Sequence, residues 1–275
     1  MKKKLIVSLH DGVAALSPEN TLICHAPLER AGALCAGEAG IFCADGCGVI
    51  WRFERETLMP QSLGCGGPGI CDLKLSACGA RLFALLGEAD CVLMSDAHTG
   101  SPLAVNRCGC NPKGMACGRD LLAVAGGESA CVHLLHIHTL EHLGEIPMPG
   151  PVYSVAVCGN TICALCMSAQ LHTILAVWRD TLIAILRLPG MPGCLHAEAE
   201  NLYIAVHGGL YVYSLASGTL RYVCRMPGRA SRLLVAMEQM VMYDPLSECV
   251  FAAFGGNPWR QICSGARDIS MVMPC

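Results

Sequence analysis

A threonine recurs along this chain at intervals of 36 to 42 residues, at or near a short turn between two runs of apolar or β-branched residues. The clearest example is the hairpin in Leu210–Gly228, where Thr219 follows the turn sequence Ala-Ser-Gly. Self-similarity near this period is the mark of a β-propeller or another repeat array. The period therefore restricts the possible fold more than any other feature. The recurring residues are Thr21, Thr57, Thr99, Thr139, Thr181 and Thr219.

One repeat unit can be divided into the four strands of a propeller blade. The innermost strand should be small and apolar because it is crowded at the axis. Residues 30–64 follow this order, with Gly and Asp at the turns between strands. The predicted strands of this unit are Ala33–Glu38, Gly40–Ala44, Gly48–Glu54 and Leu58–Leu63.

The two ends of the chain complete one another. After Gly265 only one strand remains, Asp268–Met273, whereas the first 28 residues supply three, at Lys4–Leu9, Gly12–Leu16 and Thr21–Ala26. One strand plus three makes a blade, which closes the ring and removes open sheet edges. The predicted fold is therefore all-β: a seven-bladed propeller of four-stranded antiparallel blades, each of about 39 residues. Six or eight blades remain open alternatives.

The whole chain, residues 1–275, is expected to form a single propeller domain. In the third unit the sequence indicates only three strands, Leu121–Ala125, Cys131–Ile137 and His142–Ile146. The predicted blades cover residues 30–64, 65–108, 109–150, 151–190, 191–228, 229–265, and a composite of 266–275 with 1–29.

Composition excludes several classes of protein. Hydrophobic residues make up 53% of the chain and charged residues 15%, which excludes a disordered chain. The formal net charge is −3 without a long run of either sign, so we expect no binding to nucleic acid or to a membrane surface. No stretch of about 18 apolar residues indicates a membrane-spanning helix.

The N-terminal sequence and the cysteines together indicate the cellular compartment. The start, Met1–Asp11, is basic and then apolar, but its apolar part stops at His10 and is shorter than the roughly 7–15 residues of an export signal, so we predict a strand there. A cytoplasmic, reducing location follows, in which the 20 cysteines are free thiols. Cys43, Cys91 and Cys249 stand where Val or Ala would stand in a strand, as small hydrophobic residues.

Two groups of residues could bind a metal, but neither has a recognised ligand pattern. His136 and His138 could share a face of one strand, since strand residues alternate faces. Cys108 and Cys110 lie in a loop between blades, but their spacing matches no zinc knuckle. The expectation is that the protein needs no metal and no other cofactor.

Three stretches resemble the third strand and following turn of WD40-type and YVTN (YncE-like) propellers: Val92–Gly100, Val132–Thr139 and Tyr211–Gly218. Trp51 and Trp178 occupy the tryptophan position of the Trp-Asp pair, but arginine follows each of them, and no Gly-His dipeptide precedes a first strand. The resemblance covers nearly the whole chain and implies the fold more than a particular function.

Analogy with these propellers favours a non-catalytic, monomeric scaffold that binds a protein or peptide on the loop face around the axial channel. No catalytic motif occurs in the sequence, which agrees with this interpretation. The residues expected on the binding face are Asp11, Arg30, Asp90, Glu128, Arg232 and Arg267.

A second hypothesis is a small-molecule hydrolase of the lactonase-like propeller type, with histidine and carboxylate side chains at the channel mouth. A third is a redox or metal-binding role for the loop thiols. The catalytic residues of the second hypothesis would be His10, Asp45, His207 and Asp244.

Overall fold

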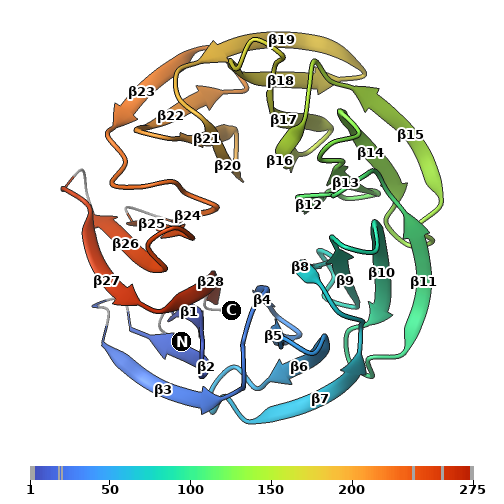
Figure 1. Ribbon diagram of the computed structural model, residues 1–275, viewed down its shortest axis with the longest axis vertical. Coiled ribbons are helices and arrows are strands. Elements are labelled where there is room, and N and C mark those ends of the chain that lie inside the picture. The colour runs from blue at the N-terminus through green and yellow to red at the C-terminus, as the bar shows by residue number, and fades with distance from the viewer. Residues whose placement is uncertain (1–3, 18, 20, 237–238, 255–256, 273–275) are drawn as a thin grey trace.

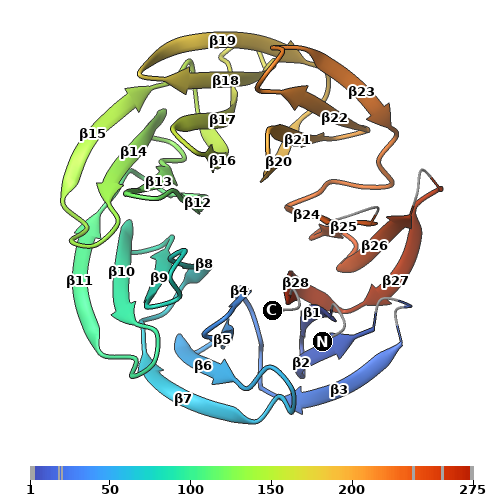
Figure 2. The same ribbon diagram turned by 180° about the vertical axis from the view of Figure 1, so that it is seen from behind.

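The computed structural model describes residues 4–17, 19, 21–236, 239–254 and 257–272. These residues form seven four-stranded antiparallel sheets that surround a central axis as the blades of a propeller (Figures 1 and 2). The predicted all-β, seven-bladed fold is confirmed. The described residues include no helix, and hence none that could cross a membrane.

The blades are numbered along the chain, and each runs from an inner to an outer strand. Blade 1 consists of β4 (Leu34–Gly37), β5 (Gly40–Ala44), β6 (Val49–Phe53) and β7 (Pro60–Cys65). Blade 2 consists of β8 (Ile70–Leu75), β9 (Arg81–Leu86), β10 (Cys91–Asp96) and β11 (Pro102–Arg107). Blade 3 consists of β12 (Gly114–Cys117), β13 (Leu121–Ala125), β14 (Cys131–His136) and β15 (His142–Pro147).

The other half of the ring repeats this order. Blade 4 consists of β16 (Val152–Cys158), β17 (Thr161–Met167), β18 (Thr173–Arg179) and β19 (Thr181–Leu188). Blade 5 consists of β20 (Pro192–Glu198), β21 (Asn201–Val206), β22 (Gly209–Ser214) and β23 (Leu220–Cys224). Blade 6 consists of β24 (Arg232–Ala236), β25 (Gln239–Asp244), β26 (Cys249–Phe254) and β27 (Arg260–Ser264).

Blade 7 is assembled from both ends of the chain, as the sequence predicts. Its strands are β28 (Ala266–Val272), β1 (Lys4–Leu9), β2 (Gly12–Leu16) and β3 (Leu22–Pro27). The inner strand β28 pairs with β1, with Ile6 opposite Ser270. Figure 1 shows the blue N-terminal strands beside the red C-terminal strand. This pairing closes the ring.

The core is a series of layers between neighbouring blades. Second strands are buried on both faces, so they are continuous apolar runs, as in β5 and β17. Outer strands alternate exposed and partly buried residues, as in β15. Phe42 of blade 1, for example, packs in the same cluster as Leu73 and Leu82 of blade 2.

The recurring threonines mark the turns between third and outer strands. In blade 2 the Asp96 carboxylate accepts hydrogen bonds from the backbone N–H and the hydroxyl of Thr99, at 2.9 and 3.1 Å. Gly100 follows with φ of 74°, and a Cβ there would lie 2.0 Å from the carbonyl oxygen of Leu63 in blade 1. The turn is therefore specified by side-chain hydrogen bonds and by close backbone approach.

The third unit corrects the prediction of only three strands. It has an inner strand, β12, whose sequence Gly-Met-Ala-Cys contains no β-branched residue and so carries little strand signal. Its pairing with β13 places Met115 opposite Val124. A carboxylate on the neighbouring blade, Asp72, also accepts the N–H of Met115 at 2.8 Å. Tertiary contacts therefore compensate for weak local propensity.

No disulfide joins the 19 described cysteines. Several are core residues: Cys43, Cys163 and Cys166 are completely buried. Burial raises the pKa of Cys43 and Cys163 to about 12, so their thiols stay protonated at neutral pH. These cysteines act as small hydrophobic residues.

Candidate functional site

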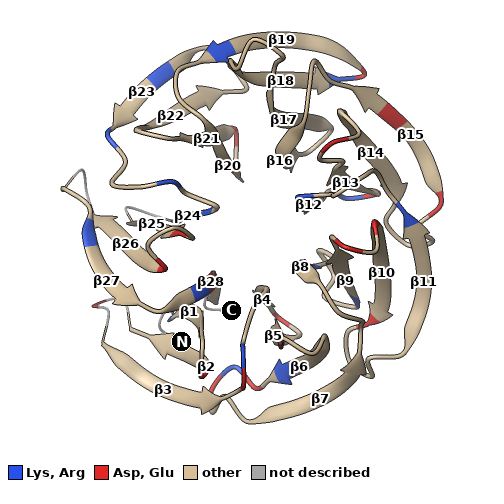
Figure 3. Ribbon diagram, viewed as in Figure 1, with Lys and Arg blue, Asp and Glu red and all other residues tan. Residues whose placement is uncertain are grey.

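The inner strands of all seven blades surround an axial cavity of about 620 Å³. Most residues on these strands are small or apolar, but charged residues of blades 2, 6 and 7, and Lys113 in the connection to blade 3, also line the cavity. Figure 3 shows basic residues on β24 and β28 at the edge of the central opening. The cavity is therefore the place where the fold concentrates polar chemistry.

Arg232 of β24 spans this cavity. Its guanidinium bonds the Asp268 carboxylate of the adjacent β28 at 3.0 Å and reaches Asp72 of β8 on the opposite side of the opening (Figure 1). Lys74, also on β8, lies 3.2 Å from the Asp72 carboxylate. The four side chains form one network with two positive and two negative groups.

The network is largely removed from water. The side chain of Asp72 is 1% exposed, that of Asp268 7% and that of Arg232 22%. Burial alone would raise the pKa of Asp72, but Arg232 and then Lys74 outweigh it and hold this pKa below its usual range. Burial opposes the charge of Arg232, yet Asp268 and Asp72 raise its pKa well above its usual range. The ions therefore stabilise one another.

The two carboxylates also join neighbouring blades. Asp72 Oδ2 accepts the N–H of Met115 on β12, and Asp268 Oδ2 accepts the N–H of Leu34 on β4, at 2.8 and 3.0 Å. Ser154 has the corresponding role in blade 4, where its hydroxyl oxygen accepts the N–H of Leu195 on β20 at 3.0 Å. These inner-strand side chains therefore hold the ring together.

Burial suppresses the reactivity of two cysteines and one histidine that line the cavity. Burial raises the pKa of Cys117 and Cys194 to about 12, so neither is a thiolate nucleophile at neutral pH. Burial also lowers the pKa of His196, which keeps its imidazole neutral. The arrangement resembles a structural ionic network more than an acid–base pair poised for catalysis.

The end of the ring that we call the loop face consists of the turns between second and third strands together with the connections between blades. These segments include residues 10–11, 45–48, 87–90, 126–130, 168–172, 207–208 and 245–248, and the connections 28–33, 66–69, 108–113, 148–151, 189–191 and 225–231.

The four residues of the hydrolase hypothesis lie on or next to the loop face but in four different blades. Asp45 accepts hydrogen bonds from its own turn and from the Trp51 indole, at 2.9 Å. Asp244 likewise accepts bonds within its own turn, from the Leu246 N–H at 3.1 Å. His207 is exposed in the β21–β22 turn. His10 contacts neither aspartate in the hydrogen bonds of the described residues.

His10 instead joins a small charged cluster between blades 7 and 6. Its Nε2 lies 3.2 Å from Glu248, and its Nδ1 lies 3.0 Å from the guanidinium of Arg267. Arg267 and Glu248 are 3.4 Å apart. Arg267, which the sequence places on the binding face, thus reaches the loop face from the start of β28.

The other residues of the predicted binding face are spread around the ring. Asp11 is exposed and lies 3.6 Å from His25, and Arg30 is exposed in the connection into blade 1. Asp90 and Glu128 both contact Asn111, Asp90 at its backbone N–H and Glu128 at its side-chain amide. Arg232 differs from this group because it begins β24 and projects into the cavity.

Neither of the two predicted metal-binding pairs belongs to a group of three possible ligands among the described residues. The rings of His136 and His138 are 5.7 Å apart, but β14 ends at His136, so His138 belongs to the following turn. Cys108 is buried and Cys110 exposed.

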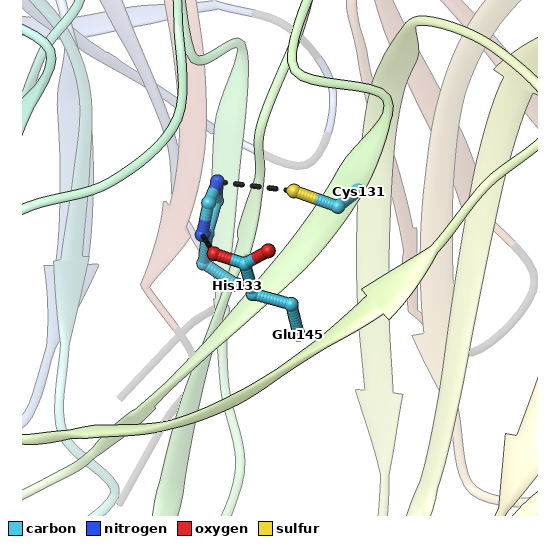
Figure 4. Close-up of side chains that lie close together, drawn as sticks. All are labelled: Cys131, His133 and Glu145. Carbon is cyan, nitrogen blue, oxygen red and sulfur yellow. Dashed lines mark hydrogen bonds and ion pairs between the residues drawn. The ribbon is translucent and has the colours of Figure 1, made fainter.

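A neighbouring cluster in blade 3 escaped the sequence reasoning. Cys131 Sγ lies 3.2 Å from His133 Nε2, and His133 Nδ1 lies 3.1 Å from the Glu145 carboxylate (Figure 4). Burial lowers the pKa of His133 and raises that of Cys131. The sequence signal for this cluster was the Cys-x-His pattern, which places both side chains on one face of a strand. In the structure Glu145 lies opposite His133 on the next strand.

No family model and no curated protein matches the chain. Among solved structures, a functionally unknown protein from Desulfotomaculum acetoxidans has a TM-score of 0.85 at 11% identity, covering 100% of both chains. A structure described as a "putative 6-phosphogluconolactonase" from Bacteroides uniformis has a TM-score of 0.76 at 11% identity, covering 98% of this chain and 99% of that one.

WD40 repeat proteins also appear among the similar structures. The RRP9 WD40 repeats have a TM-score of 0.63 at 15% identity and cover 84% of this chain and 80% of theirs. Identities this low establish the fold alone. The protein is thus a seven-bladed β-propeller, similar in fold to WD40 repeat propellers and to a propeller described as a lactonase.

Proposed function

We propose that this propeller is a non-catalytic scaffold that binds a protein or peptide on its loop face. The observation that carries the proposal is that three loop segments of consecutive blades on this face each expose an apolar side chain. Leu171 is 72% exposed in the β17–β18 turn, and Leu246 is 77% exposed in the β25–β26 turn. Met191, at the entrance to blade 5, is 42% exposed.

These apolar residues belong to blades 4, 5 and 6, which are consecutive in the ring. The loops of the other blades are richer in charge and include Asp11, Arg30, Asp90 and Glu128. Exposed apolar residues accompanied by polar and charged residues are the composition typical of a protein interface. The same face therefore supplies contact area and charges that orient a partner.

The cavity supports binding more than catalysis. Arg232, Asp72 and Asp268 bond mainly to one another and to backbone groups, so their charges are committed to the ring. A general acid or base must be free to give a proton to a substrate or to take one from it. The loops, fixed by this rigid ring, are the more suitable place for recognition.

The test is affinity capture from the source cells with two variants. The double variant Leu171→Ser/Leu246→Ser removes two of the three exposed apolar side chains. The control is Met59→Ser, because Met59 is 66% exposed in the β6–β7 turn at the other end of the blades. Two truncated contact residues at about 1–1.5 kcal/mol each should weaken the affinity for a partner by about 30- to 150-fold, and recovery falls with it.

A stoichiometric partner that is lost with the double variant and kept with Met59→Ser supports the proposal. Equal recovery with all three proteins, or no saturable partner, contradicts it.

The fold similarity to the B. uniformis protein keeps a lactonase as the second candidate, because that match covers nearly the whole of both chains. The test is hydrolysis of a 6-phosphogluconolactone by purified protein. The scaffold proposal expects no rate above spontaneous hydrolysis. Turnover that disappears in His10→Ala or His207→Ala would favour the hydrolase instead.

A further inference from the structure

We propose that Cys131, His133 and Glu145 of blade 3 form a zinc-binding site. One ligand atom from each of the three side chains lies within 4.8 Å of the ligand atoms of the other two. Figure 4 shows the thiol at one nitrogen of the imidazole and the carboxylate at the other. Thiolate, imidazole and carboxylate are the three ligand types that zinc prefers.

The spacing of the donor atoms fits a tetrahedral ion. Zinc bonds of about 2.0–2.3 Å place neighbouring ligand atoms about 3.5 Å apart. Cys131 Sγ and His133 Nε2 are separated by 3.2 Å, and the hydroxyl oxygen of Ser129 is 3.2 Å from the first and 3.3 Å from the second. Ser129 or a water molecule completes the coordination. Glu145 lies at the other ring nitrogen, Nδ1, and is half exposed, so its carboxylate would turn toward the Nε2 side to reach the ion.

The other blades show that this cluster departs from the repeat. Cys91 and Cys249 begin the third strands of blades 2 and 6, as Cys131 does in blade 3. Two residues further on, blade 2 has Leu93 opposite Val105, whereas blade 3 has His133 opposite Glu145. Blade 6 has Phe251 opposite Gln261 there, so neither comparison blade pairs an imidazole with a carboxylate at this position. The imidazole and carboxylate are additions to the structural pattern.

Access to the cluster suits an ion better than a larger substrate. The side chain of His133 is only 8% exposed, and Cys131 is 6% exposed. The backbones of Gly109 and Gly126 cover the ring so closely that a Cβ at either position would lie 2.9 Å from Nε2. These backbones leave no room for an acyl substrate beside the sulfur, so the cluster suits a small ion better. Binding displaces the thiol proton to solvent, and water molecules bound to the ion leave as the protein ligands replace them.

The probes are zinc and cobalt with the full-length protein, stripped with a chelator under reducing conditions. Cobalt bound by a cysteine thiolate gives a sulfur-to-metal charge-transfer band, so it reports the ligand as well as the ion. Wild type is expected to retain about one zinc per chain after gel filtration. The cobalt band and the retained zinc should fall at least tenfold in Cys131→Ser and in His133→Ala.

The control is Cys249→Ser, a buried cysteine at the equivalent position of another blade, which should bind as wild type does. Metal-free melting curves establish that the variants fold, and Glu145→Gln, at a half-exposed position, supplies a milder change that should weaken zinc binding about 10- to 100-fold. A band that persists in Cys131→Ser, or the absence of any band in wild type, overturns the proposal. So does rapid alkylation of Cys131 that zinc does not slow.

Discussion

Replacing Arg232 with methionine should reveal how strongly the ionic network holds the ring together. Arg232→Met keeps a long apolar stem but leaves Asp268, and in part Asp72, without a counter-ion in a site where their side chains are 7% and 1% exposed. Removing one partner of a buried ion pair costs about 3–5 kcal/mol. Lys74 remains 3.2 Å from Asp72, and both carboxylates keep backbone N–H donors. We therefore expect a loss of about 2–4 kcal/mol in the free energy of unfolding at pH 7.

The pH dependence of this loss follows from the Asp72 carboxyl. In wild type its pKa lies below the ordinary value of 3.8, so its stabilising contribution is present above that value and is lost as pH falls through the folded pKa. In Arg232→Met the cation that opposed burial is gone, so Asp72 takes up a proton at a higher pH. Protonation relieves the unpaired charge, and the difference between variant and wild type should shrink as pH falls from 7 toward 4.

Urea unfolding followed by circular dichroism at several pH values measures both effects. The variant Asp72→Asn is the companion, because it removes the charge and keeps an oxygen that can accept the Met115 N–H. Since the two residues are in contact, the double variant should be less destabilised than the sum of the single variants, by about 1–3 kcal/mol. A loss below about 1 kcal/mol in Arg232→Met that does not change with pH would refute the reasoning.

Three further predictions concern the repeat, the core and the thiols. Gly100→Ala should destabilise the protein by about 2–4 kcal/mol in urea unfolding, because its Cβ would meet a backbone oxygen. Gly159 also has a positive φ but open space around it, so Gly159→Ala should cost only about 1–2 kcal/mol. Phe83→Ala, at a completely buried position, should cost about 3–5 kcal/mol in the same assay, and a smaller loss than 1 kcal/mol would contradict the interblade packing. Iodoacetamide at pH 8 should label the exposed Cys47 in the native protein and should not label Cys163 until urea is added. Peptide mass spectrometry measures the labelling, and equal labelling of the two cysteines would contradict the burial of Cys163.

Much of the fold could be predicted because each blade repeats a local pattern of apolar strands and turn residues. Lys4–Leu9, Gly12–Leu16 and Gly40–Ala44 are strands with the predicted bounds. The inner strand of blade 3 could not be predicted, because Gly114–Cys117 has only a weak intrinsic preference for strand structure. Its position depends on a hydrogen bond to Asp72 in blade 2. A strand fixed by a tertiary contact leaves little trace in its own sequence.

The candidate sites were harder to predict for a related reason. Asp72, Arg232 and Asp268 are brought together only by closure of the ring, so no local spacing connects them. The blade 3 cluster did leave a local trace, since Cys131 and His133 alternate on one strand. Its third member depends on the register of β14 against β15, which shifts at a bulge between Leu134 and Leu135. Sequence spacing alone does not reveal such a shift.

The most direct test of the proposed binding function is hydrogen–deuterium exchange of the protein alone and with its captured partner. The loop face proposal predicts slower exchange in the turns at residues 168–172 and 245–248 and in the connection at 189–191. The outer strands β11 and β15, which face away from the axis, should exchange at unchanged rates. Protection confined to the outer strands, with no change in these loops, would contradict a partner site on the loop face.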